Sequence, residues 1–192
     1  MTTIYYTATS VDGFIADPDN SLSWLFEVPR EPPSDHPAAA DAFGRFLDGV
    51  GAFAMGSTTY EWLLDHERLL ADPGKWSGWY ADRPCWVFTH RDLPAIPGAD
   101  VRFVQGDVAP IHAQMAAAAA DSNIWLAGGG DLVGAFADEG LLDEIHLGVQ
   151  PVFLGAGAPL LPRRLTSERV TLQSVVRDGQ EVNLIYRVGS PG

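Results

Sequence analysis

Short apolar segments that each end at a turn-forming sequence recur four times in the first two thirds of this 192-residue chain. Stretches with the composition of helices lie between them, and strands that alternate with helices predict a mostly parallel sheet with crossover helices. The expected strands are residues 4–9, 52–55, 85–88 and 124–127. The expected helices are residues 38–47, 59–70, 110–120 and 131–138.

The pattern changes after about residue 143, because three further strand-like segments follow without helices between them. These are residues 144–153, 169–177 and 181–188, and the last two are joined by a hairpin signal at Asp178-Gly179-Gln180. An antiparallel flap is therefore expected to close the sheet. With 46% hydrophobic residues and neither a repeat nor a linker, residues 1–192 are predicted to form a single α/β domain.

The charge balance narrows the class of partner. Only 12 basic residues face 25 acidic ones, and the net charge of −13 predicts a surface that repels nucleic acids and anionic membranes. A small phosphorylated ligand stays compatible with that field, because local amides and one or two arginines can hold it. Cys85 is the single cysteine, which excludes an internal disulfide. The absence of a basic leader and of a long apolar run predicts a soluble, cytoplasmic protein.

Turn residues follow three of the expected parallel strands, at the ends where ligands bind in open α/β sheets. The first turn places hydroxyl side chains at the start of a helix, where a phosphate would meet unpaired amides. The alternative is a capped helix without a ligand. The residues of this turn are Gly56, Ser57, Thr58 and Thr59.

The second turn is Thr89, His90 and Arg91, and its guanidinium suits a ribose 2′-phosphate, which favours NADP over NAD. An exposed structural arginine is the alternative. In the third turn, consecutive glycines allow the backbone to approach a ligand closely. Its spacing departs from the Rossmann fingerprint, so the alternative is a tight corner between strand and helix. The residues of this third turn are Gly128, Gly129, Gly130, Asp131 and Leu132.

No metal site is predicted. The five histidines lack metal-ligand spacing. Residues 17–28 lack a glycine at position 6 and a glutamate at position 12, where a calcium loop needs them. A Gly-x-Ser-x-Gly elbow is also missing, which argues against a serine hydrolase. The loops at residues 17–20 and 28–37 are long enough to act as lids, with plain solvent-exposed loops as the alternative.

Taken in order, five motifs resemble the dihydrofolate reductase-like superfamily, and in particular the family of the C-terminal reductase domain of bacterial riboflavin biosynthesis proteins. The resemblance extends over residues 4–188 and implies a three-layer α/β fold with NADPH lying across the strand ends. The motifs are Ser10-Val11-Asp12-Gly13, Met55-Gly56-Ser57-Thr58-Thr59-Tyr60-Glu61, Val87-Phe88-Thr89-His90-Arg91, Leu126-Ala127-Gly128-Gly129-Gly130 and residues 151–160.

The resemblance assigns the adenosine phosphates to the first and second turns, and the pyrophosphate and nicotinamide to the third. It also implies a cis peptide bond between Gly128 and Gly129. Dihydrofolate reductases carry an arginine where this chain has Ser57, so the phosphate clamp would depend on Arg91. Dihydrofolate reductases also use a carboxylate on the helix before this motif to protonate and orient the pterin. Asp41 is its nearest counterpart here, which makes Asp41 the candidate catalytic residue, with a surface aspartate as the alternative.

The implied activity is NADPH-dependent reduction of a small heterocycle: either the pyrimidine of the riboflavin pathway, as in 5-amino-6-(5-phosphoribosylamino)uracil reductases, or a pterin or folate. The basic segment with which riboflavin-pathway enzymes bind a ribose phosphate is not found at the expected place. A homodimer is expected by family analogy, and a non-catalytic nucleotide-binding or sensing homodimer is the alternative function. The candidate substrate residues are Ser10, Asp12, Gly13, Trp24 and Phe43, of which the aromatic ones have a plain core role as their alternative.

Overall fold

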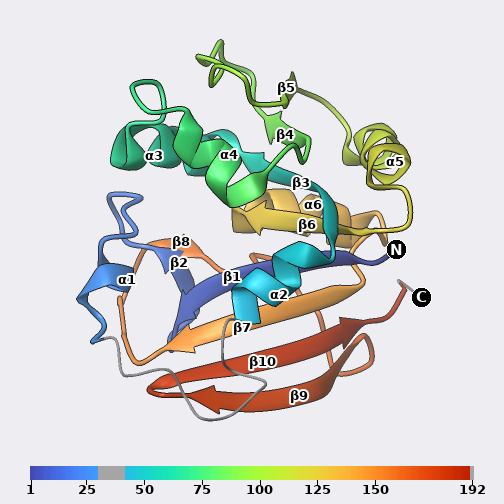
Figure 1. Cartoon of the computed structure of the whole chain (residues 1–192). Coiled ribbons are helices and arrows are strands. Elements are labelled where there is room, and N and C mark those ends of the chain that lie inside the picture. Colours follow the sequence, from blue (N-terminus) through green and yellow to red (C-terminus); the bar gives the residue numbers. More distant parts are fainter. Residues whose placement is uncertain (30–41, 191–192) are drawn as a thin grey trace.

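A computed structural model describes residues 1–29 and 42–190 of the chain. One eight-stranded sheet runs through the molecule in the order β5-β4-β3-β6-β1-β7-β10-β9 (Figure 1). Its strands are β1 (Thr3–Ser10), β3 (Val50–Gly56), β4 (Cys85–Phe88), β5 (Val101–Val104), β6 (Asn123–Gly128), β7 (Glu144–Gln150), β9 (Val170–Asp178) and β10 (Glu181–Val188). A separate antiparallel pair joins β2 (Phe14–Ala16) to β8 (Ala158–Pro159).

The strands from β5 to β7 pair in parallel, whereas β10 pairs antiparallel with both β7 and β9. The predicted parallel sheet with a C-terminal antiparallel hairpin is therefore confirmed. The strand expected over residues 144–153 is shorter in the structure. It ends at Gln150, because Pro151 has no N–H group with which to continue a ladder.

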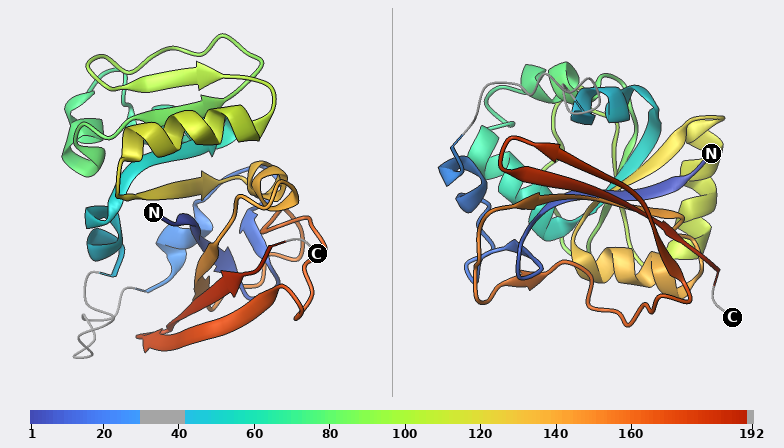
Figure 2. Two further views of the ribbon diagram at one scale, coloured as in Figure 1. Left: turned by 90° about the vertical axis from the view of Figure 1, so that its right-hand side faces the viewer. Right: turned by 90° about the horizontal axis from the view of Figure 1, so that it is seen from below.

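Helices cover both faces of the sheet and complete a three-layer α/β fold (Figure 2). Helices α5 and α6 pack on one face, and α3 and α4 pack on the other. The helices are α1 (Trp24–Glu27), α2 (Ala42–Asp48), α3 (Ser57–Glu67), α4 (Gly74–Tyr80), α5 (Val108–Ala119) and α6 (Gly130–Asp138). Within residues 1–29 and 42–190, none of these helices is long and apolar enough to cross a lipid bilayer.

Two buried clusters of apolar side chains hold the layers together, one on each face of the sheet. Tyr5, Leu126 and Phe136 are fully buried in the cluster beneath α5 and α6. Phe53 and Trp76 are buried in the cluster beneath α3 and α4.

Helix α3 begins at Ser57 and ends at Glu67, so the helix expected over residues 59–70 was placed too late. Gly56 is its N-cap, and the hydroxyl residues that were expected to cap it occupy its first turn instead. At the other end, Arg68 adopts a left-handed conformation (φ 53°), and its N–H donates to the carbonyl of Leu64. A residue in that conformation cannot continue a right-handed helix.

Strand β5 and helix α4 were not expected from the sequence. Helix α4 contains two glycines, which disfavour helix by about 1 kcal/mol each relative to alanine. Burial of Trp76 and Tyr80 on one side of this helix supplies the packing that local propensity lacks. Strand β5 has only four residues, and its edge position is set by pairing with β4.

His112 joins α5 to the first strand and gives the fold a dependence on pH. Its Nε2 lies 2.8 Å from the hydroxyl oxygen of Thr3, and burial lowers the pKa of the ring, an effect that nearby Asp143 partly opposes. A histidine with a lowered folded-state pKa binds fewer protons when folded than when unfolded. The stability it supports is thus present above about pH 6.5, the unfolded value, and is lost as the pH falls toward the folded pKa.

We expect the free energy of unfolding to fall as the pH drops below about 6.5, and His112→Gln to make that fall shallower, because glutamine keeps a polar atom near Thr3 but does not titrate. Urea denaturation at several pH values measures this, with His90→Gln, at an exposed position, as the control. Equal pH slopes for the wild type and His112→Gln would show that His112 does not carry the effect.

Candidate nucleotide-binding site

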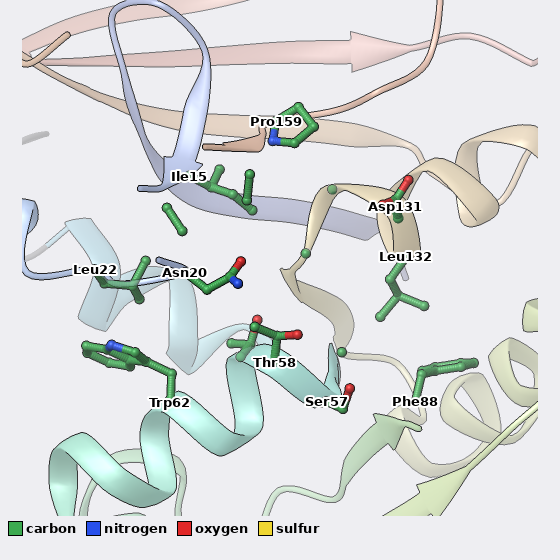
Figure 3. Close-up of a pocket in the computed structure, with 16 residues that line it drawn as sticks. Ile15, Asn20, Leu22, Ser57, Thr58, Trp62, Phe88, Asp131, Leu132 and Pro159 are labelled. Carbon is green, nitrogen blue, oxygen red and sulfur yellow. The ribbon is translucent and has the colours of Figure 1, made fainter. Parts of the chain in front are cut away.

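A pocket of about 330 Å³ opens at the carboxyl ends of the parallel strands, at the lower end of the size range of small-molecule sites. Figure 3 shows Ser57 and Thr58 of α3 on one side, Leu132 of α6 on another, and Ile15 and Pro159 across from them. The lining residues are Ile15, Ala16, Asn20, Leu22, Gly56, Ser57, Thr58, Thr59, Trp62, Phe88, Gly129, Gly130, Asp131, Leu132, Ala158 and Pro159.

The first and third predicted turns meet in this pocket. A β-carbon placed on Gly56 would lie 3.6 Å from the amide nitrogen of Gly129, and one placed on Gly128 would lie 3.8 Å from the hydroxyl oxygen of Thr59. The two turns come from neighbouring strands, because β3 pairs with β6 through Met55 and Gly128. Gly128 has a φ of 130°, a conformation that residues with a side chain rarely adopt.

Both helices that begin at this pocket lack a side-chain cap. Gly56 is the N-cap of α3 and Gly129 is the N-cap of α6, and neither helix has a side-chain hydrogen bond at its N-terminus. The amides of a first turn have no partner within their own helix and carry the positive end of the helix dipole. Residues 57–59 therefore lie in the first turn of α3 and do not cap it, and the N-termini of α3 and α6 border one cavity.

The third turn is also pressed against the opposite wall of the pocket. The peptide bond between Gly128 and Gly129 is cis, as the family resemblance implies. A β-carbon on Gly130 would overlap the carbonyl oxygen of Pro159 and lie 2.6 Å from that of Leu160. The segment it touches includes β8, which pairs with β2, the strand that contains Ile15 and Ala16.

The second turn reaches the pocket through Arg91. Its Nη2 donates to the hydroxyl oxygen of Ser57 over 2.9 Å, and its two terminal nitrogens donate to both carboxylate oxygens of Glu61. Thr89 shapes the turn, because its hydroxyl oxygen accepts the Arg91 amide over 2.9 Å. His90 is exposed and lies 3.3 Å from the side-chain oxygen of Gln105. Arg91 is thus placed at the rim of the first turn.

The candidate substrate residues do not line this pocket. The Asp12 carboxylate accepts hydrogen bonds from the Ser10 hydroxyl and from the amides of Gly155 and Leu154, which hold the pKa of Asp12 below its usual value. Ser10, Asp12 and Gly13 thus form a turn that fastens the end of β1 to the loop after β7. These hydrogen bonds give Asp12 a structural role, and its predicted contact with substrate stays a prediction.

The other three candidates for substrate and catalysis lie elsewhere or cannot be placed. Trp24 is buried, with 5% of its surface exposed. Phe43 lies edge-on to Tyr6 and Trp125, with ring centroids 5.5 Å apart in both pairs. Asp41 lies outside the described residues. Trp24 therefore follows the core alternative, whereas Phe43 is 42% exposed and its predicted contact with substrate stays a prediction.

Several lining residues were not expected from the sequence. Ile15 and Phe88 carry no polar group that would single them out, Trp62 lies within an expected helix, and Pro159 belongs to a motif to which no role was assigned. Asn20 belongs to the loop considered as a lid, and that loop does form one side of the pocket. The signal that could have found Pro159 is Gly130 itself, since a glycine inside a helix start indicates close contact with another segment.

A second cavity of about 330 Å³ lies against β1, β7, β10 and β9. The rings of Tyr6, Phe46 and His146 form one wall, with centroids 4.7–5.9 Å apart. Burial, with a smaller contribution from Glu181, raises the pKa of Tyr6 to about 12, so its hydroxyl keeps its proton at neutral pH. The remaining lining residues are Arg45, Leu147, Ser174, Val176, Asn183, Leu184 and Ile185.

Comparison with known proteins decides the family. The model of the RibD C-terminal domain matches residues 63–184, which is more than half of the chain. The chain belongs to the RibD C-terminal domain family. The uncharacterized protein YwjB of Bacillus subtilis (strain 168) is 32% identical over 184 residues, which cover 96% of each protein.

Solved structures agree with membership of the RibD C-terminal domain family. A protein from Shewanella sp. PV-4, described as a "Putative riboflavin biosynthesis protein", is 25% identical and has a TM-score of 0.73, with 98% of this chain and 99% of that one covered. The dihydrofolate reductase of Enterococcus faecalis, solved with NADP(H) and RAB-propyl, is 13% identical with a TM-score of 0.57 and coverages of 98% and 97%. The second likeness shows a shared dihydrofolate reductase-like fold.

Gly130→Ala tests whether the contact between the third turn and residues 159–160 holds the pocket together. We expect a loss of about 2–3 kcal/mol in the free energy of unfolding, because the added methyl group overlaps two backbone carbonyls that cannot move aside alone. The matched control is Gly78→Ala in α4, where nothing lies within 4 Å and a gain of about 0.5–1 kcal/mol is expected. Urea denaturation measures both, and equal effects in the two variants would contradict the packing described.

Proposed function

We propose that this protein binds NADPH in the pocket at the strand ends and reduces a small heterocyclic substrate. Membership of the RibD C-terminal domain family supports a reductase-type function. The observation that carries the cofactor assignment is the pair of uncapped helix N-termini, those of α3 and α6, that open into one pocket.

The residues of the pocket fit a dinucleotide phosphate chain. Amides at the first turn of a helix point at an anion, and the helix dipole contributes about 0.3–1 kcal/mol at each N-terminus. Hydroxyl groups of Ser57, Thr58 and Thr59 stand at the same edge as further donors. The glycine backbone of the third turn leaves room for the pyrophosphate to approach. These local donors act on the phosphates at contact distance. The more distant charges that make up the net charge of −13 are screened by salt.

Arg91 is assigned to the ribose 2′-phosphate that distinguishes NADPH from NADH. Its guanidinium lies 2.9 Å from Ser57, the position at which dihydrofolate reductases carry an arginine of their own. Three of its five N–H groups are engaged by Ser57 and Glu61, which leaves two for a phosphate oxygen. The assignment agrees with NADP(H) in the Enterococcus faecalis reductase.

When bound, NADPH supplies a hydride to the substrate. The protein's part is to fix the orientation of the two reactants and to exclude water from the space between them. Ile15, Leu132 and Pro159 give the pocket apolar walls suited to that task. The proton that completes the reduction comes from solvent or from the substrate, so the proposal requires no acidic side chain in the pocket.

We assign the substrate to the second cavity. Tyr5 pairs with Leu126, two residues before Gly128, so the neighbouring Tyr6 in that cavity lies one strand away from the third turn. The hydroxyl of Tyr6 and the polar side chains of Ser174 and Asn183 offer donors and acceptors beside aromatic rings. Such a lining suits a planar, uncharged ring of the pyrimidine or pterin type.

A non-catalytic nucleotide-binding role is the second candidate, because none of the five predicted substrate residues lines the first pocket. Either role is compatible with a cytoplasmic homodimer. Edge strand β9 offers a surface for pairing, since Leu172 and Val175 on it are 50% and 57% exposed. Turnover of pterin or ribitylamino-pyrimidine compounds by NADPH would separate the reductase from the binding module.

Thermal unfolding with added NADPH tests the cofactor assignment. A ligand at 100 times its Kd stabilises the folded protein by about 2.7 kcal/mol, so a clear rise in Tm is expected at millimolar NADPH. Thr58→Glu should weaken NADPH binding at least tenfold, because its carboxylate would occupy the anion site at the start of α3. That variant should still fold, because helix N-termini favour acidic residues.

Thr58→Gln, of the same size but neutral, is the matched control and should lose less affinity than Thr58→Glu. The absence of any NADPH-dependent shift in the wild type would remove the cofactor assignment. An undiminished shift in Thr58→Glu would show that NADPH binds somewhere other than this pocket.

A further inference from the structure

We propose that Glu61 limits the preference of the site for NADPH over NADH by neutralising Arg91, so that the site accepts both dinucleotides. The inference rests on the proposed function and concerns the same pocket. It assigns a specificity-determining role to Glu61, the last residue of the second sequence motif, for which the motif itself implies no role.

The geometry joins Glu61 to the only cation that approaches the first turn within the described part of the chain. The Glu61 oxygens accept Arg91 Nη1 over 2.9 Å and Nη2 over 2.5 Å, a bidentate pair. The same Nη2 donates to Ser57, so Glu61, Arg91 and the start of α3 form one cluster. None of the sixteen residues lining the pocket is a lysine or an arginine.

The charge of this cluster decides how strongly it attracts a 2′-phosphate. A phosphate monoester carries −1.5 to −2 charges at pH 7, and it would approach a guanidinium whose charge a carboxylate already balances. The side chains of Arg91 and Glu61 are 55% and 36% exposed, so water screens the repulsion without removing it. Glu61 therefore reduces the gain in affinity that the extra phosphate of NADPH brings.

The same carboxylate favours the cofactor without the phosphate. In dinucleotide sites an acidic side chain accepts a hydrogen bond from the ribose 2′-hydroxyl of NAD, whereas an arginine accommodates the 2′-phosphate of NADP. In this chain the acidic residue is Glu61 and the arginine is Arg91, and the two are in direct contact at the same rim. The pair thus offers an acceptor to NADH and a partly neutralised cation to NADPH.

The test compares Kd values for NADPH and NADH, measured by isothermal titration calorimetry on the whole chain. Glu61→Gln keeps the length and one oxygen acceptor for Arg91 but removes the negative charge. We expect it to lower the Kd for NADPH about tenfold, which is the size of effect that one charge at 4–6 Å exerts on a phosphate dianion in water. The Kd for NADH should rise by about two- to fivefold, because the neutral amide is a weaker acceptor for the ribose 2′-hydroxyl than the carboxylate is.

Asp65→Asn is the matched control, because Asp65 is an exposed acid one turn further along α3. It removes the same charge from the same helix at a greater distance, so both Kd values should change by less than about twofold. Added salt should reduce the tenfold gain in Glu61→Gln, as expected for a Coulombic effect between exposed groups.

A rise in the NADPH Kd on Glu61→Gln would overturn the inference, because Glu61 would then serve to hold Arg91 in place for the phosphate. An unchanged NADPH Kd, or the same change in Asp65→Asn, would overturn it as well. Both results would leave the proposed function standing so long as the wild type binds NADPH. A wild type that binds neither dinucleotide would remove the proposed function and this inference together.

Discussion

The close approach of three backbone segments at the carboxyl ends of the sheet is the constraint on which the rest of the site depends. Gly128 and Gly129 lie against Gly56 and Thr59, and Gly130 lies against the carbonyls of Pro159 and Leu160. A side chain at Gly130 would overlap those carbonyls, and Gly128 has a positive φ that residues with a side chain rarely adopt. Because the glycines permit the contact, helices α3 and α6 begin at the same opening and direct their first turns into one pocket.

This arrangement lets a strongly acidic protein offer a site for anions. The favourable electrostatics come from backbone amides and from one arginine, not from the overall charge of the chain. Acidic side chains stand beside these donors: Asp131 lines the pocket with its side chain 89% exposed, and Glu61 holds Arg91. Affinity at such a site depends on contact geometry, and the choice between related cofactors depends on single charged side chains at its rim.

The sequence predicted the sheet and the turns because those features are encoded locally. Strands β1, β3, β4 and β6 are short apolar runs that end at glycine or at hydrogen-bonding turn residues, and the structure confirms each of them. Helix α4 was missed because its residues favour helix only when Trp76 and Tyr80 are buried against the sheet. The strand expected over residues 144–153 ends early, because Pro151 lacks the N–H group that the next rung of the ladder requires.

The site was predicted less completely than the fold, since its contacts join positions far apart in the chain. The first and third turns were correctly expected to share a pocket from the rule for parallel strand ends. The contact of Glu61 with Arg91 spans 30 residues, and no local pattern indicates it. The Asp12 carboxylate accepts hydrogen bonds from the amides of Gly155 and Leu154, which lie more than 140 residues away, so no local pattern indicates this contact either.

Amide hydrogen exchange with and without NADPH tests most directly whether the three turns form one dinucleotide site. The account predicts that added NADPH slows exchange at residues 57–59, 89–91 and 129–132 together, with little change along the exposed strand β9. Slowed exchange in one of the turns alone, or at a surface remote from all three, would contradict it.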